Sequence, residues 1–260
     1  YEAFGWEIPT YIHLPLIMGK DADGNVSKLS KRHGATGFYD LIDEGYLPEA
    51  IINYIALLGW CPKDNQEIFT LKELEKAFDI SGISKSPAVF DYDKLSWFNG
   101  EYIKAMTPEK FTEVAMPYYK KVFGDKQMPY EKFAAILQKR TTQLTQIPEM
   151  LDFFAELPSY TKELFVNKKS KTNLENSPVV LKEAYDRLKA MPEWNETSIH
   201  DCLINMAVEK ELKNGTVMWP VRIAAAGKTV TPGGAVEILD ILGRDESLAR
   251  LEKGMAILAE

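Results

Sequence analysis

The apolar positions of the chain follow a helical period over most of its length. In the clearest stretch, apolar side chains come at i, i+3, i+4 and i+7 spacing, as on the buried face of a helix: Ile51, Tyr54, Ile55 and Leu58. Pro48 suits the first turn of this helix, and Gly59 suits its end. The sequence therefore predicts a helix from Pro48 to Gly59.

Signals for helix starts recur further along the chain. Thr70 and Glu73 have the spacing of a capping box, in which each side chain bonds the backbone N–H of the other residue. A capping hydroxyl followed by proline comes before three later apolar stripes, at Thr107, Ser177 and Thr231. Over roughly the last 150 residues no alternation of period two competes with these signals. The last two thirds of the chain are therefore predicted to be mainly α-helical.

The first 36 residues have a different pattern. Tyr11–Met18 is a short apolar run that Pro15 interrupts, so it predicts at best an edge strand or an irregular strand. Asp21–Asn25 is a turn cluster, and Lys28–Gly34 is a basic loop that ends in glycine. This part is predicted to be α/β structure.

Composition narrows the class of protein. Of the 260 residues, 45% are apolar and 27% charged, and no apolar run has the length of a membrane helix. With two cysteines and three histidines, the chain predicts neither a disulfide scaffold nor a zinc centre. Cys61 and Cys202 are expected to be reduced and partly buried, as in a cytoplasmic protein. Because the chain begins at Tyr1 without a Met or a signal peptide, we expect it to be part of a longer protein.

The net charge of −7 excludes a nonspecific nucleic-acid coat, but two local clusters are basic. One cluster lies in the loop after Lys28, and the other comprises Lys162, Lys168, Lys169 and Lys171. In the first, Lys28-Leu29-Ser30-Lys31-Arg32 places three cations and a hydroxyl within five residues. Such a loop suits a polyphosphate, because lysines neutralise phosphate oxygens while charge builds on a leaving pyrophosphate. Taken alone, such a string more often belongs to a solvated basic loop.

The neighbours of this loop change its interpretation. Lys28–Arg32 resembles the KMSKS signature of class I aminoacyl-tRNA synthetases, in the form typical of the glutamate enzymes. Further segments resemble the same family in the same order: His13–Ile17, Gly19–Gly24, Leu47–Ala50, Asn53–Tyr54, Leu57–Trp60, Ser84–Asp91, Lys94–Ile103, Trp219–Arg222 and Gly227–Gly234. The chain thus resembles the C-terminal part of a bacterial-type glutamyl-tRNA synthetase.

The resemblance implies an ATP site in the basic loop. Lys31, supported by Lys28, would have the catalytic role of stabilising the ATP phosphates while glutamate is activated. The ATP-binding residues would be Lys28, Leu29, Ser30, Lys31 and Arg32. ATP with Mg²⁺, glutamate and tRNA(Glu) are the implied ligands of the full-length enzyme, which we expect to be a cytoplasmic monomer without zinc in this part and without a membrane segment. The family's His-x-Gly-His type motif does not occur in these residues, so we expect the chain alone to bind tRNA without catalysing the reaction.

The resemblance also implies an anticodon site. Arg140 matches the position that contacts the third anticodon base, although an exposed helix-end arginine and an offset toward Gln138 or Gln143 remain alternatives. Arg222 matches an arginine that contacts the first two bases. Thr231 and Pro232 match further contacts and would also cap a helix, and Gly234 stands at a further contact position that is usually apolar. The sequence departs from the family pattern at Ala226 and at Gly234.

The implied fold is mainly α, with helical stem-contact and anticodon-binding regions after a short α/β remnant of a Rossmann-like catalytic domain. The expected boundaries are 1–36 for that remnant with the KLSKR loop, 37–105 for the stem-contact region, and 106–176 and 177–260 for two anticodon-binding subdomains. The alternative function is a stand-alone, non-catalytic module that binds tRNA or docks a partner. An ATP loop argues against this alternative, because such a module has no use for one.

Two other groups of residues are assigned structural roles. Trp60, Trp97 and Trp219 could serve as platforms for bases, but their apolar neighbours at helical spacing favour core packing. Asp91 and Asp93 could bind a metal ion, but the absence of further acidic residues nearby favours a turn or a cap.

Overall fold

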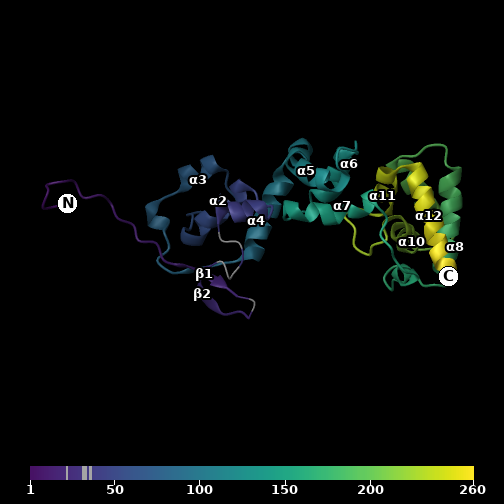
Figure 1. The fold of residues 1–260 in the computed structure, drawn as a ribbon, viewed down its shortest axis with the longest axis horizontal. Coiled ribbons are helices and arrows are strands. Elements are labelled where there is room, and N and C mark those ends of the chain that lie inside the picture. Colours follow the sequence, from purple (N-terminus) through teal and green to yellow (C-terminus); the bar gives the residue numbers. More distant parts are fainter. Residues whose placement is uncertain (22, 31–33, 35–36) are drawn as a thin grey trace. The chain divides into compact units, whose positions relative to one another are not determined.

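The computed structural model describes all residues of the chain except 22, 31–33 and 35–36. The described chain forms two compact units (Figure 1). Unit 1 comprises Tyr1–Ala105 with Thr142–Leu144, and unit 2 comprises Met106–Thr141 with Thr145–Glu260. Within the described residues, no helix has both the length and the apolar character that crossing a membrane requires. The fold is mainly α-helical, as the sequence predicts.

A small sheet lies in unit 1. Its middle strand, β1 (Ile17–Lys20), pairs antiparallel with β2 (Val26–Lys28) and parallel with β3 (Ala88–Phe90). The turn between β1 and β2 is closed by Asp21, whose carboxylate accepts from the backbone N–H of Asn25 at 2.8 Å. The prediction of an edge strand within residues 11–18 is wrong. The strand begins only after Pro15, which lacks an N–H, and it is paired on both sides.

In unit 1, the helices predicted from Pro48 and after Thr70 begin where the sequence predicts. Unit 1 contains α1 (Phe38–Asp43), α2 (Pro48–Gly59), α3 (Leu71–Ala77) and α4 (Tyr92–Ala105), with a short 3₁₀ turn at Ile80–Gly82. The capping box is confirmed, since the Thr70 hydroxyl accepts from the Glu73 N–H and the Glu73 carboxylate accepts from the Thr70 N–H. The core lies between α2, α4 and the sheet, and contains Leu41, Tyr46, Ile51, Tyr54, Phe90, Leu95 and Phe98.

A buried side-chain amide joins segments of unit 1 that are distant in sequence. The Asn99 side chain is fully buried; its oxygen accepts from the Leu47 N–H at 2.8 Å. Its nitrogen donates to the carbonyls of Gly45 at 3.2 Å and Thr142 at 2.6 Å. Asn99 therefore holds the loop before α2 and the segment Thr142–Leu144 together within unit 1.

Unit 2 consists of helices. Its first group is α5 (Pro108–Phe123), α6 (Tyr130–Leu137) and α7 (Ile147–Ala155), with a 3₁₀ turn at Leu144–Gln146 before α7. Thr107 caps α5 as predicted, because its hydroxyl accepts from the Lys110 N–H at 3.3 Å. The buried side chains of α5 repeat every four residues and pack against α6 and α7: Phe111, Ala115, Tyr119 and Phe123.

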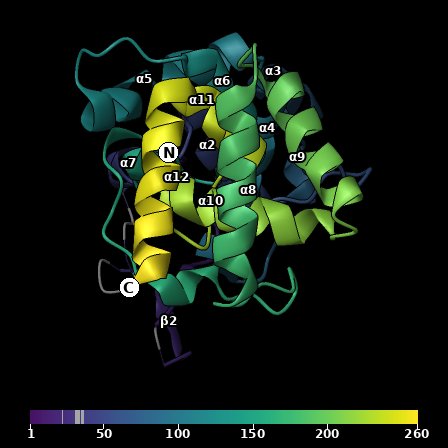
Figure 2. The same ribbon diagram turned by 90° about the vertical axis from the view of Figure 1, so that its right-hand side faces the viewer.

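The second group of unit 2 surrounds one central helix. A 3₁₀ turn, η4 (Lys162–Phe165), precedes α8 (Asn176–Ala190), α9 (Glu196–Glu209), α10 (Asn214–Ala226), α11 (Ala235–Leu242) and α12 (Arg244–Ala259). Helix α10 packs against the other four helices. Figure 2 shows α8 and α12 side by side. Gly254 allows α12 to approach α10 closely, since a Cβ at this position would lie 2.6 Å from the Ala224 Cβ.

Some predicted helix starts are displaced. Thr231 and Pro232 do not begin α11, which starts after Gly234, where the Glu237 carboxylate accepts from the Gly234 N–H at 3.1 Å. The Thr231 hydroxyl instead donates to the carbonyl of Gly233 at 2.7 Å. Ser177 does not cap a helix either, because it lies inside the first turn of α8, where Glu175 occupies the cap position.

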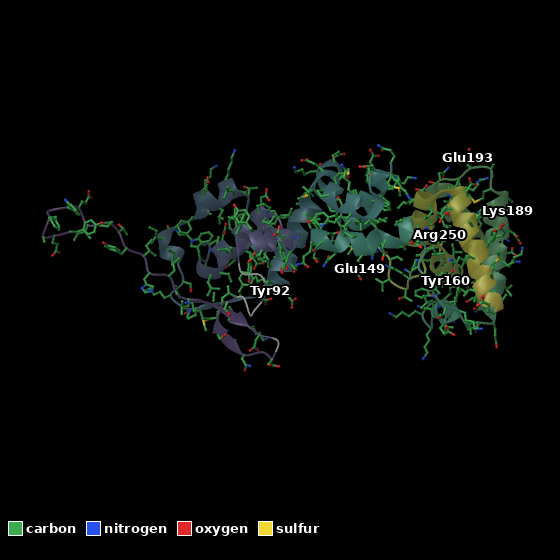
Figure 3. All side chains as sticks on the ribbon, in the orientation of Figure 1. Tyr92, Glu149, Tyr160, Lys189, Glu193 and Arg250 are labelled. Atoms are coloured by element: carbon green, nitrogen blue, oxygen red, sulfur yellow. The ribbon has the colours of Figure 1, made fainter. Side chains whose placement is uncertain are left out.

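One buried arginine joins the two groups of helices. Arg250 of α12 is 4% exposed, and it donates to the carbonyls of Phe153 at 2.7 Å and Ala225 at 2.9 Å (Figure 3). Its Nε also donates to Glu246 at 2.6 Å. These hydrogen bonds connect the C-terminal ends of α7 and α10 to α12 and stabilise their packing.

The structural roles of the tryptophans and aspartates are partly confirmed. Trp60 lies in the core with Phe69 and Leu74, but Trp97 is 44% exposed, so its assignment to the core is wrong. Asp91 caps α4 as predicted, since its carboxylate accepts from the Asp93 N–H at 2.9 Å. Cys61 is exposed, in contrast to the prediction that both cysteines are partly buried.

Candidate nucleic-acid interface

A hollow of about 720 Å³ opens on unit 2. Its wall comes from segments that are distant in sequence: Arg140 after α6, the first turn of α7, Leu164 of η4, and the loop Gly227–Pro232 between α10 and α11. Figure 3 marks Glu149, which belongs to the α7 part of this wall. The hollow therefore brings together residues of both helix groups of unit 2.

Arg222 of α10 lies next to the hollow on an aromatic support. Its guanidinium carbon is 4.6 Å from the centre of the Trp219 ring, and one amino group donates to the carbonyl of Thr229 at 3.0 Å. The Trp219 ring is itself held, because its N–H donates to the carbonyl of Leu164 at 2.9 Å. Nε of Arg222 is buried and bonds no other described residue. The ring contact and the bond to Thr229 thus fix the orientation of the guanidinium.

The charge of Arg222 is not compensated within the described residues. Burial lowers the pKa of Arg222, and the nearby positive charge of Arg140 lowers it further. Within the same part of the chain neither arginine has an ion pair. Two guanidinium groups that repel one another beside a hollow favour an anionic ligand or one rich in hydrogen-bond acceptors.

Arg140 reaches the hollow from the turn after α6, where its N–H donates to the carbonyl of Leu137 at 2.8 Å. The side chain is exposed. The two glutamines that could have replaced it are engaged elsewhere. The Gln138 amide donates to the carbonyl of Met106 at 2.7 Å, and Gln143 bonds the Tyr46 hydroxyl in unit 1. Of these three residues, Arg140 lines the hollow.

The loop after α10 depends on a glycine and an ion pair. Gly227 ends α10 with φ +64°, and a Cβ at this position would lie 2.9 Å from the Tyr160 ring, so both conformation and space require glycine. Lys228 donates to the two carboxylate oxygens of Asp152 at 2.6 and 2.7 Å, which fixes the loop to α7. The loop is therefore shaped before any ligand arrives.

The remaining predicted anticodon residues differ in position. Thr231 and Pro232 are buried in the wall of the hollow. Gly234 is not part of that wall and instead begins α11. Between these and Gly227, Val230 is 83% exposed, an unusual degree for an apolar side chain.

The predicted ATP loop lies in unit 1 and is described only in part. Lys28 ends β2 and is exposed, whereas Leu29 packs against the core and its N–H donates to the carbonyl of Ile17 at 3.1 Å. Ser30 is half-buried. Lys31 and Arg32 lie outside the described residues. The sheet thus places Lys28 at its end with an exposed ammonium group, which suits a phosphate.

The acidic residues of the described chain form no group of three or more potential metal ligands. Sequence reasoning missed Trp219 as the support of Arg222, as well as Lys228 and Val230. The i, i+3 spacing of Trp219 and Arg222 on a predicted helix was an available signal for the first, because such residues are neighbours on the helix surface. The ion pair of Lys228 with Asp152 joins two segments that are far apart in the sequence, so no local pattern indicates it.

Comparison with known families agrees with this arrangement. Residues 1–97 match the catalytic domain of class I tRNA synthetases (E and Q), and residues 110–255 match an anticodon binding domain. The second match covers more than half of the chain and contains Arg140, Arg222 and the loop Gly227–Pro232.

Individual relatives carry the same family name. Glutamate–tRNA ligases of Clostridium kluyveri and Clostridium tetani are 52% and 50% identical over 98% of this chain and 51% of their own length. A crystal structure of a glutamate tRNA ligase from Elizabethkingia meningosepticum, in complex with its amino acid, has a TM-score of 0.80 at 30% identity, covering 99% of this chain and 53% of that one. The chain spans about half the length of the relatives that it matches, and it belongs to the glutamate–tRNA ligase family of class I tRNA synthetases.

Proposed function

We propose that the chain reads tRNA(Glu) for a glutamate–tRNA ligase and that the hollow of unit 2 receives the anticodon. The observation that carries this proposal is that Arg140 lines the hollow and Arg222 bonds Thr229 of its wall, and that neither arginine has a compensating ion pair in the described residues. Single-stranded bases expose acceptor edges and flat faces, and guanidinium groups can bind both. The hollow and its two arginines therefore suit unstacked bases better than a duplex.

Several residues in the wall of the hollow and beside it have a part in this proposal. Arg140 would donate to the acceptor edge of the third anticodon base, and Arg222 would contact the first two bases while Trp219 holds its plane. A pair of donors aimed at one base edge contributes about 1–3 kcal/mol of discrimination against a wrong base. Exposed Val230 would offer apolar contact to a base, and buried Thr231 and Pro232 would limit the depth of the hollow.

The reaction proposed for the enzyme joins glutamate to tRNA(Glu) through a glutamyl-adenylate. ATP is the co-substrate, and Mg²⁺ supplies charge neutralisation on its phosphates. The exposed ammonium of Lys28 fits an ATP phosphate, and Lys31 is assigned to the same task. In a Lys28→Ala enzyme we expect loss of ATP–pyrophosphate exchange with tRNA binding retained. We expect the unmodified full-length enzyme to act as a cytoplasmic monomer.

The division of labour along the chain follows from the same proposal. Residues 1–36 would complete the catalytic domain, and residues 37–105 would contact the tRNA stem. Residues 106–176 and 177–260 would bind the anticodon, as two subdomains that both contribute to the hollow. Gly234 would act by allowing α11 to start beside the hollow, since a Cβ there would lie 2.9 Å from the Glu237 carboxylate.

A binding experiment tests the proposal. The affinity of the 260-residue chain is measured by filter binding for tRNA(Glu) and for an unrelated tRNA at one salt concentration. We expect a preference for tRNA(Glu) that Arg222→Ala removes. The matched control is Arg187→Ala, since Arg187 lies in the same unit but is paired with Glu183 and Glu209. An unmodified chain without a preference would refute the anticodon assignment, as would a preference that Arg222→Ala leaves intact.

A further inference from the structure

A second basic feature of unit 2 is a short hairpin between η4 and α8. Asn167 and Thr172 form a two-way backbone bridge at 3.1 and 3.0 Å, and the residues between them form the turn. Lys168, Lys169 and Lys171 lie on this turn, and all three side chains are exposed. We call these three residues the lysine hairpin.

The backbone of the lysine hairpin is fixed at several points. The Asn167 side chain accepts from the Ser170 N–H at 2.9 Å, and the Thr216 hydroxyl of α10 donates to the carbonyl of Ser170 at 2.7 Å. The Asn176 amide of α8 donates to the carbonyl of Lys171 at 2.9 Å. Thr172 is buried beneath the turn. The three ammonium groups therefore project from a held turn, so a ligand does not have to order the backbone.

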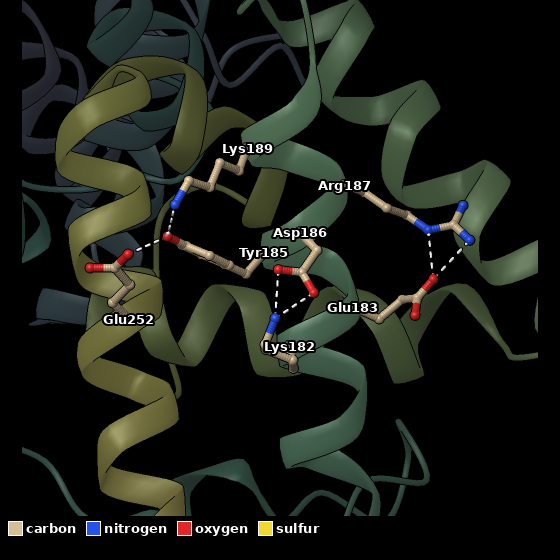
Figure 4. A network of polar contacts seen from close by, with 7 residues as sticks. All are labelled: Lys182, Glu183, Tyr185, Asp186, Arg187, Lys189 and Glu252. Carbon is tan, nitrogen blue, oxygen red and sulfur yellow. Dashed lines mark hydrogen bonds and ion pairs between the residues drawn. The ribbon is translucent and has the colours of Figure 1, made fainter.

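The charges of the lysine hairpin are uncompensated, in contrast to those of the neighbouring helix. None of the three lysines has an ion pair with a described residue. On α8, Figure 4 shows lysines with side-chain partners: Lys182 forms an ion pair with Asp186, to which it donates at 2.6 Å, and Lys189 donates to the Tyr185 hydroxyl at 3.1 Å. That hydroxyl in turn bonds Glu252 of α12. In a chain of net charge −7, three adjacent unpaired cations favour a polyanionic partner.

The lysine hairpin lies close in sequence to a wall residue of the hollow, and the same helix holds it. Leu164 of η4 lines the hollow, and its carbonyl accepts from the Trp219 ring that supports Arg222. Lys168 follows four residues later, so at most about 14 Å of extended chain separates the two. Thr216, which holds the turn, lies one helical turn before Trp219 on α10. One helix therefore positions both the arginine at the hollow and the hairpin.

We propose that the lysine hairpin binds the sugar–phosphate backbone of the RNA strand whose bases enter the hollow. The proposal rests on the proposed function, and it adds a surface that contributes affinity without reading sequence. Lysine suits this task because its ammonium is a compact point charge that binds phosphate oxygens in many orientations. The base edges would be read by the arginines, and the hairpin would hold the strand in place.

The test compares two triple variants. Lys168, Lys169 and Lys171 are changed together to Ala. In the matched control, three lysines that each bond another side chain are changed to Ala: Lys182 with Asp186, Lys189 with Tyr185, and Lys210 with Glu183. Both variants lose three positive charges, so their net charges are equal. The affinity of each full chain for tRNA(Glu) and for an unrelated tRNA is measured between 50 and 300 mM KCl, with circular dichroism as the check on folding.

For the hairpin variant we expect weaker binding of both tRNAs by a similar factor, on the order of tenfold at low salt. The slope of log K against log salt should lose about 2, because three single-strand phosphate contacts contribute about 0.7 each. The control should keep the slope of the unmodified chain. A third variant with Arg at all three hairpin positions should restore the slope.

The outcomes separate this proposal from the anticodon assignment. An unchanged slope in the hairpin variant would overturn the proposal, and so would equal losses in the hairpin and control variants, which would reflect net charge alone. A preference for tRNA(Glu) that persists in either case leaves the anticodon assignment standing. Conversely, a lost slope without any preference between the tRNAs supports the hairpin and refutes the anticodon assignment.

Discussion

Residues 1–16 and the helices of unit 2 are both rich in large apolar side chains, but they differ in what covers them. In residues 1–16, Phe4 is 75% exposed, Tyr11 73% and Leu14 59%. In unit 2, Phe111, Leu181 and Leu251 are fully buried between helices. Large apolar side chains therefore form a core only where other elements of the chain pack against them.

The same contrast bears on the two candidate sites. Arg140 follows α6 and Arg222 lies on α10, and both helices bury most of their apolar side chains. Lys28 stands at the end of a three-residue strand in which every side chain is exposed. In this chain, the hollow of unit 2 is the more completely shaped of the two candidate sites, and the following predictions test that difference.

The largest effect is expected in amide hydrogen exchange. Within the described residues 1–16, only Gly5 and Trp6 donate backbone hydrogen bonds. The amides of this segment should therefore exchange nearly without protection. Amides in the middle of α10 should exchange slower by on the order of 10³-fold or more, because they open only with unit 2. Mass spectrometry of timed exchange samples measures both. Similar protection in residues 1–16 and in α10 would contradict the difference in packing between these two regions.

Replacement of the buried arginine should have the next largest effect. Arg250→Ala leaves the carbonyls of Phe153 and Ala225 without their charged donor, and we expect it to lower the free energy of unfolding of unit 2 by about 3–5 kcal/mol. Urea titration followed by circular dichroism measures the loss. Lys253→Ala, at an exposed position of the same helix, is the control and should change stability by less than about 0.5 kcal/mol. Equal effects would show that Arg250 does not join the helix groups.

A smaller loss is expected in unit 1. Asn99→Ala removes three buried hydrogen bonds, and it should cost about 2–3 kcal/mol, since it leaves the Leu47 N–H and the carbonyls of Gly45 and Thr142 unpaired. The urea transition of the variant is compared with that of Lys94→Ala, a change in an exposed ion pair on the same helix. A stability equal to that of the control would mean that Asn99 does not hold the segment Thr142–Leu144.

The smallest effect concerns a helix cap. Thr70→Ala removes one half of the capping box of α3, so we expect a loss of about 1 kcal/mol in unit 1. Thr70→Ser keeps the hydroxyl and should retain most of the stability. Thermal unfolding of the two variants distinguishes them, and a Ser variant as unstable as the Ala variant would assign the effect to the lost methyl group rather than to the cap.

The sequence predicts the helices of this fold well where the signal is local. The helix from Pro48 to Gly59 and the Thr70 capping box need only neighbouring residues, and both are confirmed. The start of α11 was misplaced because Thr231 bonds Gly233 instead of a helical N–H, a choice that depends on the fold of the loop. Trp97 was assigned to the core because its neighbours are apolar, although its own position on α4 faces outward.

The candidate site could be predicted only as a set of separate residues. The resemblance to the synthetase family names Arg140, Arg222, Thr231 and Pro232, and the structure brings these four to one hollow or its edge. The lysine cluster of residues 162–171 was visible in the sequence without an assigned role. The role proposed for it depends on Thr216 and Asn176, which hold the turn from two helices. It also depends on the lack of ion pairs between the hairpin lysines and other described residues. Such contacts between distant segments leave no periodic pattern.

The most direct test of the account measures whether Arg140 reads the third anticodon base. The unmodified chain and Arg140→Gln are each titrated with tRNA(Glu) and with the same tRNA carrying G in place of C at that base. Arg187→Gln serves as the control. We expect the unmodified chain to prefer C by about 1–3 kcal/mol, or about 5- to 150-fold, and Arg140→Gln to lose that preference while the control keeps it. An equal preference for C in all three proteins would contradict the account.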